Sequence, residues 1–279
     1  MRDTIPADNA VAARPSAAGP VLHRVVTDRV ALLTMSRPHR MNALNDELVA
    51  HLKEAISSLS ADPAVGAVLL TGAGRAFCAG ADTQGLASGL GNAPLERRVE
   101  VLRARHDLVL AIRRSPKIFI AMINGPAIGS GMGLALACDF RYAGRSSYFL
   151  AGFARIAGSG DFGATWALPR LVGPEWARRM LFCDHRIDAD VAQQIGLVSK
   201  ACSDEDLLQD SMAFARRLAS GPGVSQGLMK RNLLCSESAS LSDTLDLEAT
   251  HQARASMTGD HREGIAALME KRAPRFSGS

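Results

Sequence analysis

A glycine-rich turn from Ile123 to Asp139 is the stretch of this sequence best suited to chemistry. An apolar strand is predicted over Ile118–Ile123, and Gly129, Gly131 and Gly133 then precede a helix of small residues. A strand that leads through such a turn into a helix leaves backbone N–H groups unpaired at the positive end of the helix. Those groups could hold developing negative charge. The glycines could equally serve close packing of a buried helix, and this stretch alone leaves both interpretations open.

Two further segments could contribute to a site. Ala76–Asp82 is predicted to be a strand that ends in a second turn of small residues. Asp161 lies in a predicted loop, Arg155–Gly163, just before a predicted helix. A carboxylate there could carry protons, but aspartate is also among the best residues for capping a helix N-terminus. Both roles remain open from the residues themselves.

Composition limits the classes of function. The chain has 279 residues, 47% of them hydrophobic, which is enough for a sizeable core, and only 5% are aromatic. The net charge of +4 comes from scattered basic residues. A mildly basic surface suits an anionic ligand, whereas nucleic-acid binding would call for clustered Lys and Arg with aromatics between them. Nucleic acid is therefore a disfavoured partner.

Cysteine and histidine usage argues against a metal site and against disulfides. The five cysteines are odd in number and widely spaced, and the seven histidines show no ligand-like spacing. They predict free thiols in a reducing compartment and no bound metal. No apolar run is long enough to span a membrane, and the first residues lack a hydrophobic signal core. We therefore expect a cytoplasmic protein with no membrane partner.

The elements that must position these residues alternate between strands and helices. Residues 1–20 are predicted to be a disordered leader, and residues 83–94 a mobile glycine-rich segment. Strands are expected as a pair within Val21–Met35, and then at Ala67–Thr71, Ala76–Asp82, Ile118–Ile123, Phe140–Ala143, Ser147–Ala151 and Val198–Lys200. Helices are expected at Asp46–Ser60, Leu95–Arg114, from near Asp161 to Leu171, Glu175–Phe182, Asp188–Gly196, Leu207–Ala219, Ser225–Ser236, Ser242–Met257 and Arg262–Glu270.

The order of these elements predicts the fold class. A rhythm of strand, strand and helix with a helical tail favours an α/β spiral over a Rossmann sheet. No Gly-x-Gly-x-x-Gly follows a strand with an acidic residue placed to hold a ribose, so dinucleotide binding is disfavoured. No Gly-x-Ser-x-Gly nucleophile elbow is present either.

Taken together, the motifs resemble those of the crotonase (enoyl-CoA hydratase/isomerase) superfamily. The resemblance extends over nearly the whole chain after the leader and rests on Ser36–Pro38, Asn42–Leu44, Leu70–Asp82, Ile123–Asp139, Trp166–Gly173 and Asp260–Gly264. It implies an α/β, crotonase-type spiral of ββα units with a helical C-terminal region. The expected division is a spiral core with the acyl-CoA site over residues 21–203 and a helical trimerisation region over residues 204–279. A homotrimer, often paired into a hexamer, is the implied assembly.

The same resemblance implies an acyl-CoA thioester substrate, with coenzyme A belonging to the substrate and no separate cofactor. The family's oxyanion hole falls on the backbone N–H groups of Ala81 and Ser130. Each such donor can lower a barrier by roughly 3 kcal/mol. The family's substrate and CoA contacts fall on Met41, Ala43, Leu44, Ala79, Asp82, Thr83, Gln84 and Phe153. Cationic partners for the CoA phosphates could come from Arg37, Arg40, Lys230 or Lys271, and no one of them is preferred.

The chain departs from the hydratases of this family at two positions. Hydratases use two glutamates, and their positions here hold Gly133 and Phe153. Without a carboxylate pair to hold water and move its proton, hydration is disfavoured. Asp161 matches the acidic residue of the family's isomerases, and the same position holds the nucleophile of aryl-CoA dehalogenases. We therefore expect double-bond isomerisation with Asp161 as acid and base.

Other interpretations remain open. Asp161 could act as the nucleophile of an aryl-CoA dehalogenase or hydrolase. The chain could also be a non-catalytic acyl-CoA-binding member or, less favoured, an RNA-binding one. Asp139 is expected to be a local hydrogen-bonding residue, and Cys78 and Cys138 are expected to be inert core thiols.

Overall fold

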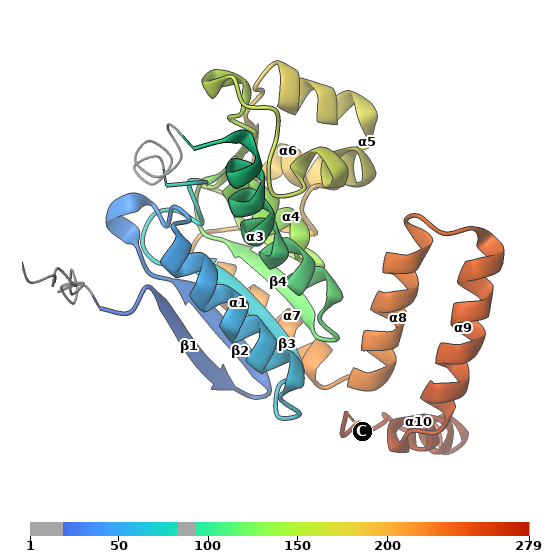
Figure 1. The fold of residues 1–279 in the computed structure, drawn as a ribbon. Coiled ribbons are helices and arrows are strands. Elements are labelled where there is room, and N and C mark those ends of the chain that lie inside the picture. Colours follow the sequence, from blue (N-terminus) through green and yellow to red (C-terminus); the bar gives the residue numbers. More distant parts are fainter. Residues whose placement is uncertain (1–18, 83–92, 279) are drawn as a thin grey trace, which may run out of the picture.

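The main feature of the computed structural model, which describes residues 19–82 and 93–278, is a six-stranded sheet in the order β1-β2-β3-β4-β6-β9 (Figure 1). Its strands are β1 (Leu22–Thr27), β2 (Val30–Met35), β3 (Ala67–Gly72), β4 (Ile118–Ile123), β6 (Phe140–Gly144) and β9 (Lys200–Cys202). β1 and β2 pair antiparallel, and every other neighbour pair is parallel. The predicted strand pair within Val21–Met35 is confirmed. Its turn is made by Asp28 and Arg29, both in the left-handed region that a tight hairpin requires.

A second, three-stranded sheet carries the glycine-rich turn. It contains β5 (Ala127–Ile128), β7 (Tyr148–Leu150) and β8 (Ile187–Asp188), with β7 in the middle. The strand predicted over Ala76–Asp82 is wrong. That segment makes only single bridges, Cys78 to Ala127 and Ala81 to Leu44, and Gly80 between them has φ +96°. Because the chain turns at Gly80, it pairs with two different segments in succession and cannot continue one ladder.

The helices surround the large sheet on both faces. Those of the core are α1 (Asp46–Ala61), α3 (Leu95–Arg114), α4 (Ser130–Ala137), α5 (Ala164–Phe182), α6 (Ala189–Gln194) and α7 (Leu207–Ala219), with 3₁₀ turns at Pro38–Arg40 and Ala154–Ile156. α1 starts as predicted, because Asn45 Oδ1 accepts the Leu48 N–H at 3.0 Å as an N-cap. α5 is interrupted at Gly173 (φ 77°, ψ 166°), so the two helices predicted on either side of that residue are confirmed.

Alternating side chains of the strands build two cores. In β3, Val68 and Leu70 pack with α1, whereas Ala67 and Leu69 pack against α7 on the opposite face. Figure 1 shows α1 and α3 in front of the sheet and α7 behind it. Strands that are buried on both faces are typical of parallel sheets covered by helices. Because helices cover the sheet on both faces, β4 and the turn that follows it are held in a fixed position.

The C-terminal segment is helical, as predicted. It contains α8 (Gly223–Ser236), α9 (Leu241–Ser256) and α10 (Gly259–Met269), which extend away from the sheet in Figure 1. The predicted strand at Val198 begins two residues later, at Lys200. The reason is that the N–H groups of Leu197 and Val198 both donate to Ala192 O and close the end of α6. Among the described helices, none combines the length and the apolar character that crossing a membrane requires.

Candidate active site

Two glycine turns from separate parts of the chain meet at one place. Cys78 N–H donates to Pro126 O at 3.1 Å, and Ile128 N–H donates to Cys78 O at 2.9 Å. A Cβ atom at Gly80 would lie only 2.9 Å from Ile128 O and 3.5 Å from Ser130 N. Because a side chain would push these backbones apart, the close approach depends on glycine at this position.

The two N–H groups expected to form an oxyanion hole are both free. Within residues 19–82 and 93–278, neither the Ala81 N–H nor the Ser130 N–H has a hydrogen-bond acceptor. Their neighbours are paired, since Asp82 N–H donates to Leu44 O at 3.0 Å and Gly129 N–H donates to Leu150 O at 3.0 Å. Ser130 is also the first residue of α4, where the helix dipole favours negative charge.

A cavity of about 380 Å³ opens in front of these groups. Six of the residues predicted for the site line it, namely Leu44, Ala79, Ala81, Ser130, Phe153 and Asp161. Other predicted residues lie behind this lining. Met41 O accepts the Ala79 N–H at 2.9 Å, Arg37 Nη1 donates to Ala43 O at 2.5 Å, and Arg37 Nη2 donates to Asp82 Oδ2 at 2.8 Å. Thr83 and Gln84 lie outside the described residues.

Asp161 faces the turn of α4. Its Oδ2 accepts the Ser130 hydroxyl at 2.8 Å, and its Oδ1 accepts the Phe162 N–H at 2.9 Å. Its side chain is 21% exposed. The capping interpretation is wrong, because the N-cap of α5 is Gly163 and Asp161 contributes only its backbone oxygen to the Ala164 N–H. The carboxylate is therefore available to the cavity.

His106 is a site residue that sequence reasoning missed. It lies on α3, and its Nε2 is 2.5 Å from Asp161 Oδ1. Its ring meets the Phe162 ring edge-on, with centroids 5.8 Å apart and planes at 86°. The sequence offers one signal for it: Leu102 and His106 are four residues apart and so share a face of the predicted helix. In the structure both residues line the cavity. That spacing alone does not say which face of the helix meets the site.

The position of the missing hydratase glutamate is sterically closed. A Cβ atom at Gly133 would lie 2.6 Å from Phe162 Cβ and 2.7 Å from Phe162 O. Phe153, at the other glutamate position, lines the cavity together with Phe162. Two aromatic rings therefore form part of the wall. Phe149 lies in the buried core, and Trp166 faces a different hollow.

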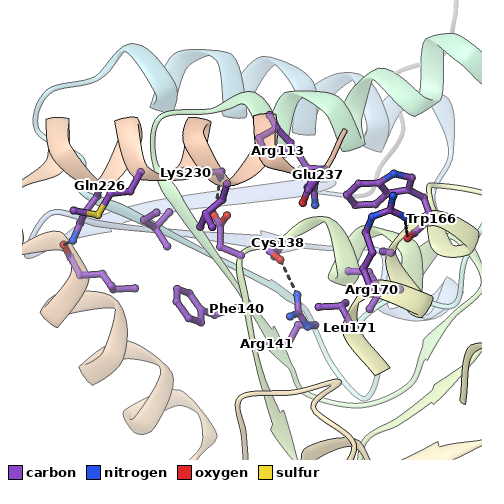
Figure 2. A pocket seen from close by; sticks show the side chains of 18 residues that line it. Arg113, Cys138, Phe140, Arg141, Trp166, Arg170, Leu171, Gln226, Lys230 and Glu237 are labelled. Atoms are coloured by element: carbon purple, nitrogen blue, oxygen red, sulfur yellow. Dashed lines mark hydrogen bonds and ion pairs between the residues drawn. The ribbon is translucent and has the colours of Figure 1, made fainter. Parts of the chain in front are cut away.

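A second hollow of about 460 Å³ lies between α8, α5 and β6 (Figure 2). Figure 2 shows Trp166 beside Arg170 at one end and Gln226 at the other. Two of its cations are paired with acids of the same hollow: Arg113 binds Glu237 at 2.5 Å, and Lys230 binds Asp139 at 2.7 Å. Lys230 is thus unsuited to be a CoA phosphate partner. Because this hollow lacks Asp161 and both free N–H groups, the smaller cavity is the candidate active site.

Among the described residues, no cysteine lines this cavity. All five are free, and burial raises the pKa of Cys78 and of Cys138 to about 12. Both side chains are fully enclosed in the core, in agreement with their predicted inertness. In the described part of the chain, no group of three or more His, Cys, Asp or Glu residues is arranged to hold a metal ion.

The mixed sheet, the small second sheet and the two converging turns define an α/β protein of the crotonase class. An enoyl-CoA hydratase from Polaromonas sp. JS666 has this fold, with a TM-score of 0.87 and 32% identity over 91% of this chain and 99% of that one. The chain belongs to the enoyl-CoA hydratase/isomerase family, whose model matches residues 26–279.

Relatives within this family carry two kinds of name. The 1,2-epoxyphenylacetyl-CoA isomerase of Escherichia coli (strain K12) is 36% identical over 250 residues, which is 89% of this chain and 95% of that protein. A protein named probable enoyl-CoA hydratase EchA12, from Mycobacterium tuberculosis (strain ATCC 25618 / H37Rv), is 38% identical over 258 residues, 89% of each chain. The family therefore includes relatives named as isomerases and relatives named as probable hydratases.

Proposed function

We propose that this protein is an isomerase that shifts a double bond in an acyl-CoA thioester. The observation that carries the proposal is the placement of the Asp161 carboxylate beside Ser130, in a cavity with two free backbone N–H groups. The closed position at Gly133 and the phenyl ring at Phe153 favour isomerisation over hydration, because neither position offers a carboxylate to hold water.

The proposed reaction needs one base and one anion site. Asp161 takes a proton from the α-carbon of a 3-enoyl-CoA, and the electron pair spreads over the chain to the thioester oxygen. The Ala81 and Ser130 N–H groups donate hydrogen bonds to that oxygen, each contributing roughly 3 kcal/mol of barrier lowering. Asp161 then returns the proton at the γ-carbon, which gives the 2-enoyl-CoA. The thioester carbonyl must lie against Gly80 and Gly129 for both donors to reach it.

The CoA portion of the substrate is proposed to follow the segments next to the turn at Gly80. Met41, Ala43, Leu44, Ala79, Asp82, Thr83 and Gln84 form this path, and Phe153 belongs to the acyl wall. Support comes from the partly buried pair between Arg37 and Asp82, which joins Asp82 at the end of the turn to Ala43 through Arg37. No separate cofactor is proposed.

The decisive test is an assay of Asp161→Asn with 3-enoyl-CoA and 2-enoyl-CoA substrates. We expect isomerisation to fall by at least about 100-fold, since a positioned acid–base group contributes a factor of that size or more. CoA-ester binding, measured by calorimetry, should persist because the amide keeps the shape of the carboxylate. Asp107→Asn, on the exposed side of α3, is the matched control and should keep full activity. Full activity of Asp161→Asn would contradict the proposed mechanism.

A second candidate function is supported by the 2.5 Å contact of His106 with Asp161. Asp161 could attack the halogen-bearing ring carbon of an aryl-CoA and expel halide. His106 would then take a proton from the water that hydrolyses the aspartyl ester. A rapid-quench digest that carries the aryl group on Asp161 would favour this reaction. Tight CoA-ester binding without any turnover would instead favour a non-catalytic binding protein.

Assembly and location are also proposals. We propose a homotrimer, or two trimers paired as a hexamer, supported by the exposed apolar side chains on α8, α9 and α10. The free thiols support the expected reducing, cytoplasmic compartment.

A further inference from the structure

We propose that Phe162 closes one end of the active-site cavity and thereby restricts the substrate to short acyl chains. This inference rests on the proposed acyl-CoA substrate and adds the size of the acyl group that the cavity accepts. It assigns to one side chain the boundary between the cavity and a further space that a longer chain could fill.

An adjoining hollow of about 430 Å³ lies beyond Phe162. Phe162 is the one described residue that lines both this hollow and the active-site cavity. The adjoining hollow shares Trp166 and Arg170, which lie side by side in Figure 2, with the larger hollow shown there. A hydrocarbon chain would suit it, because its wall includes the apolar side chains of Val109, Leu110, Leu136, Ala137, Ala167 and Leu234.

Two helices, α3 and α4, pass along the cavity first and the adjoining hollow next. On α4, Ser130 lines the cavity and Ala137 lines the hollow, with Gly133 between them. On α3, His106 lines the cavity and Val109, three residues on, lines the hollow. Residues at these spacings share a face of a helix. The hollow therefore continues the cavity along the same two helix faces.

The Phe162 side chain spans the gap between these helices. It packs on α4 so closely that a Cβ atom at Gly133 would lie 2.6 Å from Phe162 Cβ. Its ring meets the His106 ring of α3 edge-on, with centroids 5.8 Å apart. Phe162 is only 3% exposed, so the space that it occupies is filled. An acyl chain whose thioester lies at Ser130 therefore meets this ring before it reaches the adjoining hollow.

The backbone at Phe162 would suit glycine better than a bulky residue. Its φ of 49° lies in the left-handed region that bulky residues seldom adopt, between Gly160 at φ 110° and Gly163 at φ 73°. A residue persists in such a conformation only where its surroundings fix it, and strain of this kind gathers at ligand-binding sites. The nearby glycines let the loop direct the ring between α3 and α4. A phenyl group at this position fits a role in excluding ligand volume.

The test measures the binding of butanoyl-, hexanoyl- and decanoyl-CoA by calorimetry, so that it does not depend on turnover. In wild-type protein the affinity should not rise from the butanoyl to the decanoyl ester. In Phe162→Ala the ratio of decanoyl to butanoyl affinity should rise at least about tenfold, since each methylene buried in an apolar space can add a factor of about four. Phe162→Leu, which disturbs the packing less, should shift the ratio in the same direction.

Two controls separate the loss of this boundary from a general loss of packing. Phe119→Leu truncates another fully buried ring, which lines neither space, and should leave the ratio unchanged. Adding Val109→Phe to Phe162→Ala places an aromatic ring in the adjoining hollow and should return the ratio toward the wild-type value.

The possible failures are distinguishable. An unchanged ratio in both Phe162→Ala and Phe162→Leu, with butanoyl-CoA still bound, contradicts the role of Phe162 and leaves the proposed function intact. Wild-type affinity that rises steadily with chain length contradicts it as well. A gain that survives the addition of Val109→Phe contradicts the assignment of the longer chain to the adjoining hollow. If wild-type protein binds none of the three esters, the proposed function itself fails and this inference falls with it.

Discussion

At the residue scale, the contact between Gly133 and Phe162 decides which chemistry the cavity can support. A Cβ atom at position 133 would lie 2.6 Å from Phe162 Cβ and 2.7 Å from a backbone oxygen. We therefore expect Gly133→Ala to lower the free energy of unfolding by about 1–3 kcal/mol, a typical cost of overpacking. Gly133→Glu should not gain hydratase activity, because its side chain has no room beside Phe162. Urea unfolding and a hydration assay measure the two effects.

Gly264→Ala in α10 is the matched control for that substitution. Its Cβ would have ordinary contacts of 3.7 and 3.9 Å with the Phe276 ring. Alanine should therefore be neutral there, or stabilise the helix by about 0.5–1 kcal/mol through its better helix propensity. Equal effects of Gly133→Ala and Gly264→Ala would contradict the steric argument.

The buried thiols give a second prediction at this scale. Burial raises the pKa of Cys78 and of Cys138 from the ordinary value of 9.0 to about 12, so both stay protonated at pH 8. The thiolate is the reactive form, and we expect iodoacetamide at pH 8 to label exposed Cys183 and to spare these two until the chain unfolds. Because the folded pKa is raised, the stability that these thiols contribute is present below pH 9 and is lost as the pH rises toward 12. Peptide mass mapping checks the labelling, and modification of Cys78 in the folded protein would contradict it.

At the element scale, one lysine ties α8 to the core. Lys230 is 8% exposed, and its ammonium donates to Ile112 O and Lys117 O at 3.0 Å and to Asp139 Oδ2 at 2.7 Å. Asp139 also accepts the Phe119 N–H at 2.8 Å, which confirms its predicted local hydrogen-bonding role. We expect Lys230→Met to lower the free energy of unfolding by about 3–5 kcal/mol, because it leaves Asp139 without its cation.

The control for this prediction is a lysine with a similar partner at the surface. Lys53 pairs with Asp107 at 3.4 Å in an exposed setting, so Lys53→Met should cost at most about 1 kcal/mol. Adding Asp139→Asn to Lys230→Met should recover part of the loss, since it removes the unpaired, partly buried charge. A Lys230→Met protein as stable as Lys53→Met in urea would show that Lys230 does not anchor α8.

The elements also show where sequence reasoning succeeds. The β1–β2 hairpin, α1 and the helical tail follow from local periodicity and capping, because their signals lie within each segment. The prediction of a strand over Ala76–Asp82 was wrong. The apolar residues of this segment are buried, but the segment makes single bridges to two different parts of the chain and does not pair along one strand. The same limit applies to the site. Ala81 and Ser130 are marked by glycine-rich turns, whereas His106 meets Asp161 only through the packing of α3 against a loop 55 residues away.

At the scale of the whole molecule, the helical tail leaves an apolar surface without a partner in the single chain. Met229 and Leu233 of α8 are 59% and 69% exposed, and both line the hollow of Figure 2. Further exposed apolar side chains follow on α9 and α10 at Leu241, Leu245, Leu268 and Met269. A surface of this kind is rarely left open to water, and it supports the proposed assembly of identical chains.

We expect light scattering of the purified protein to give roughly three or six times the chain mass of 29.6 kDa. The double variant Met229→Glu/Leu233→Glu should shift the mass toward that of a single chain, because two carboxylates would have to be buried at the contact. Leu208→Glu is the matched control, since Leu208 is 52% exposed on α7 and does not line that hollow, and its substitution should leave the mass unchanged. A wild-type protein with the mass of one chain, or an unchanged mass in the double variant, would show that α8 does not form the contact between subunits.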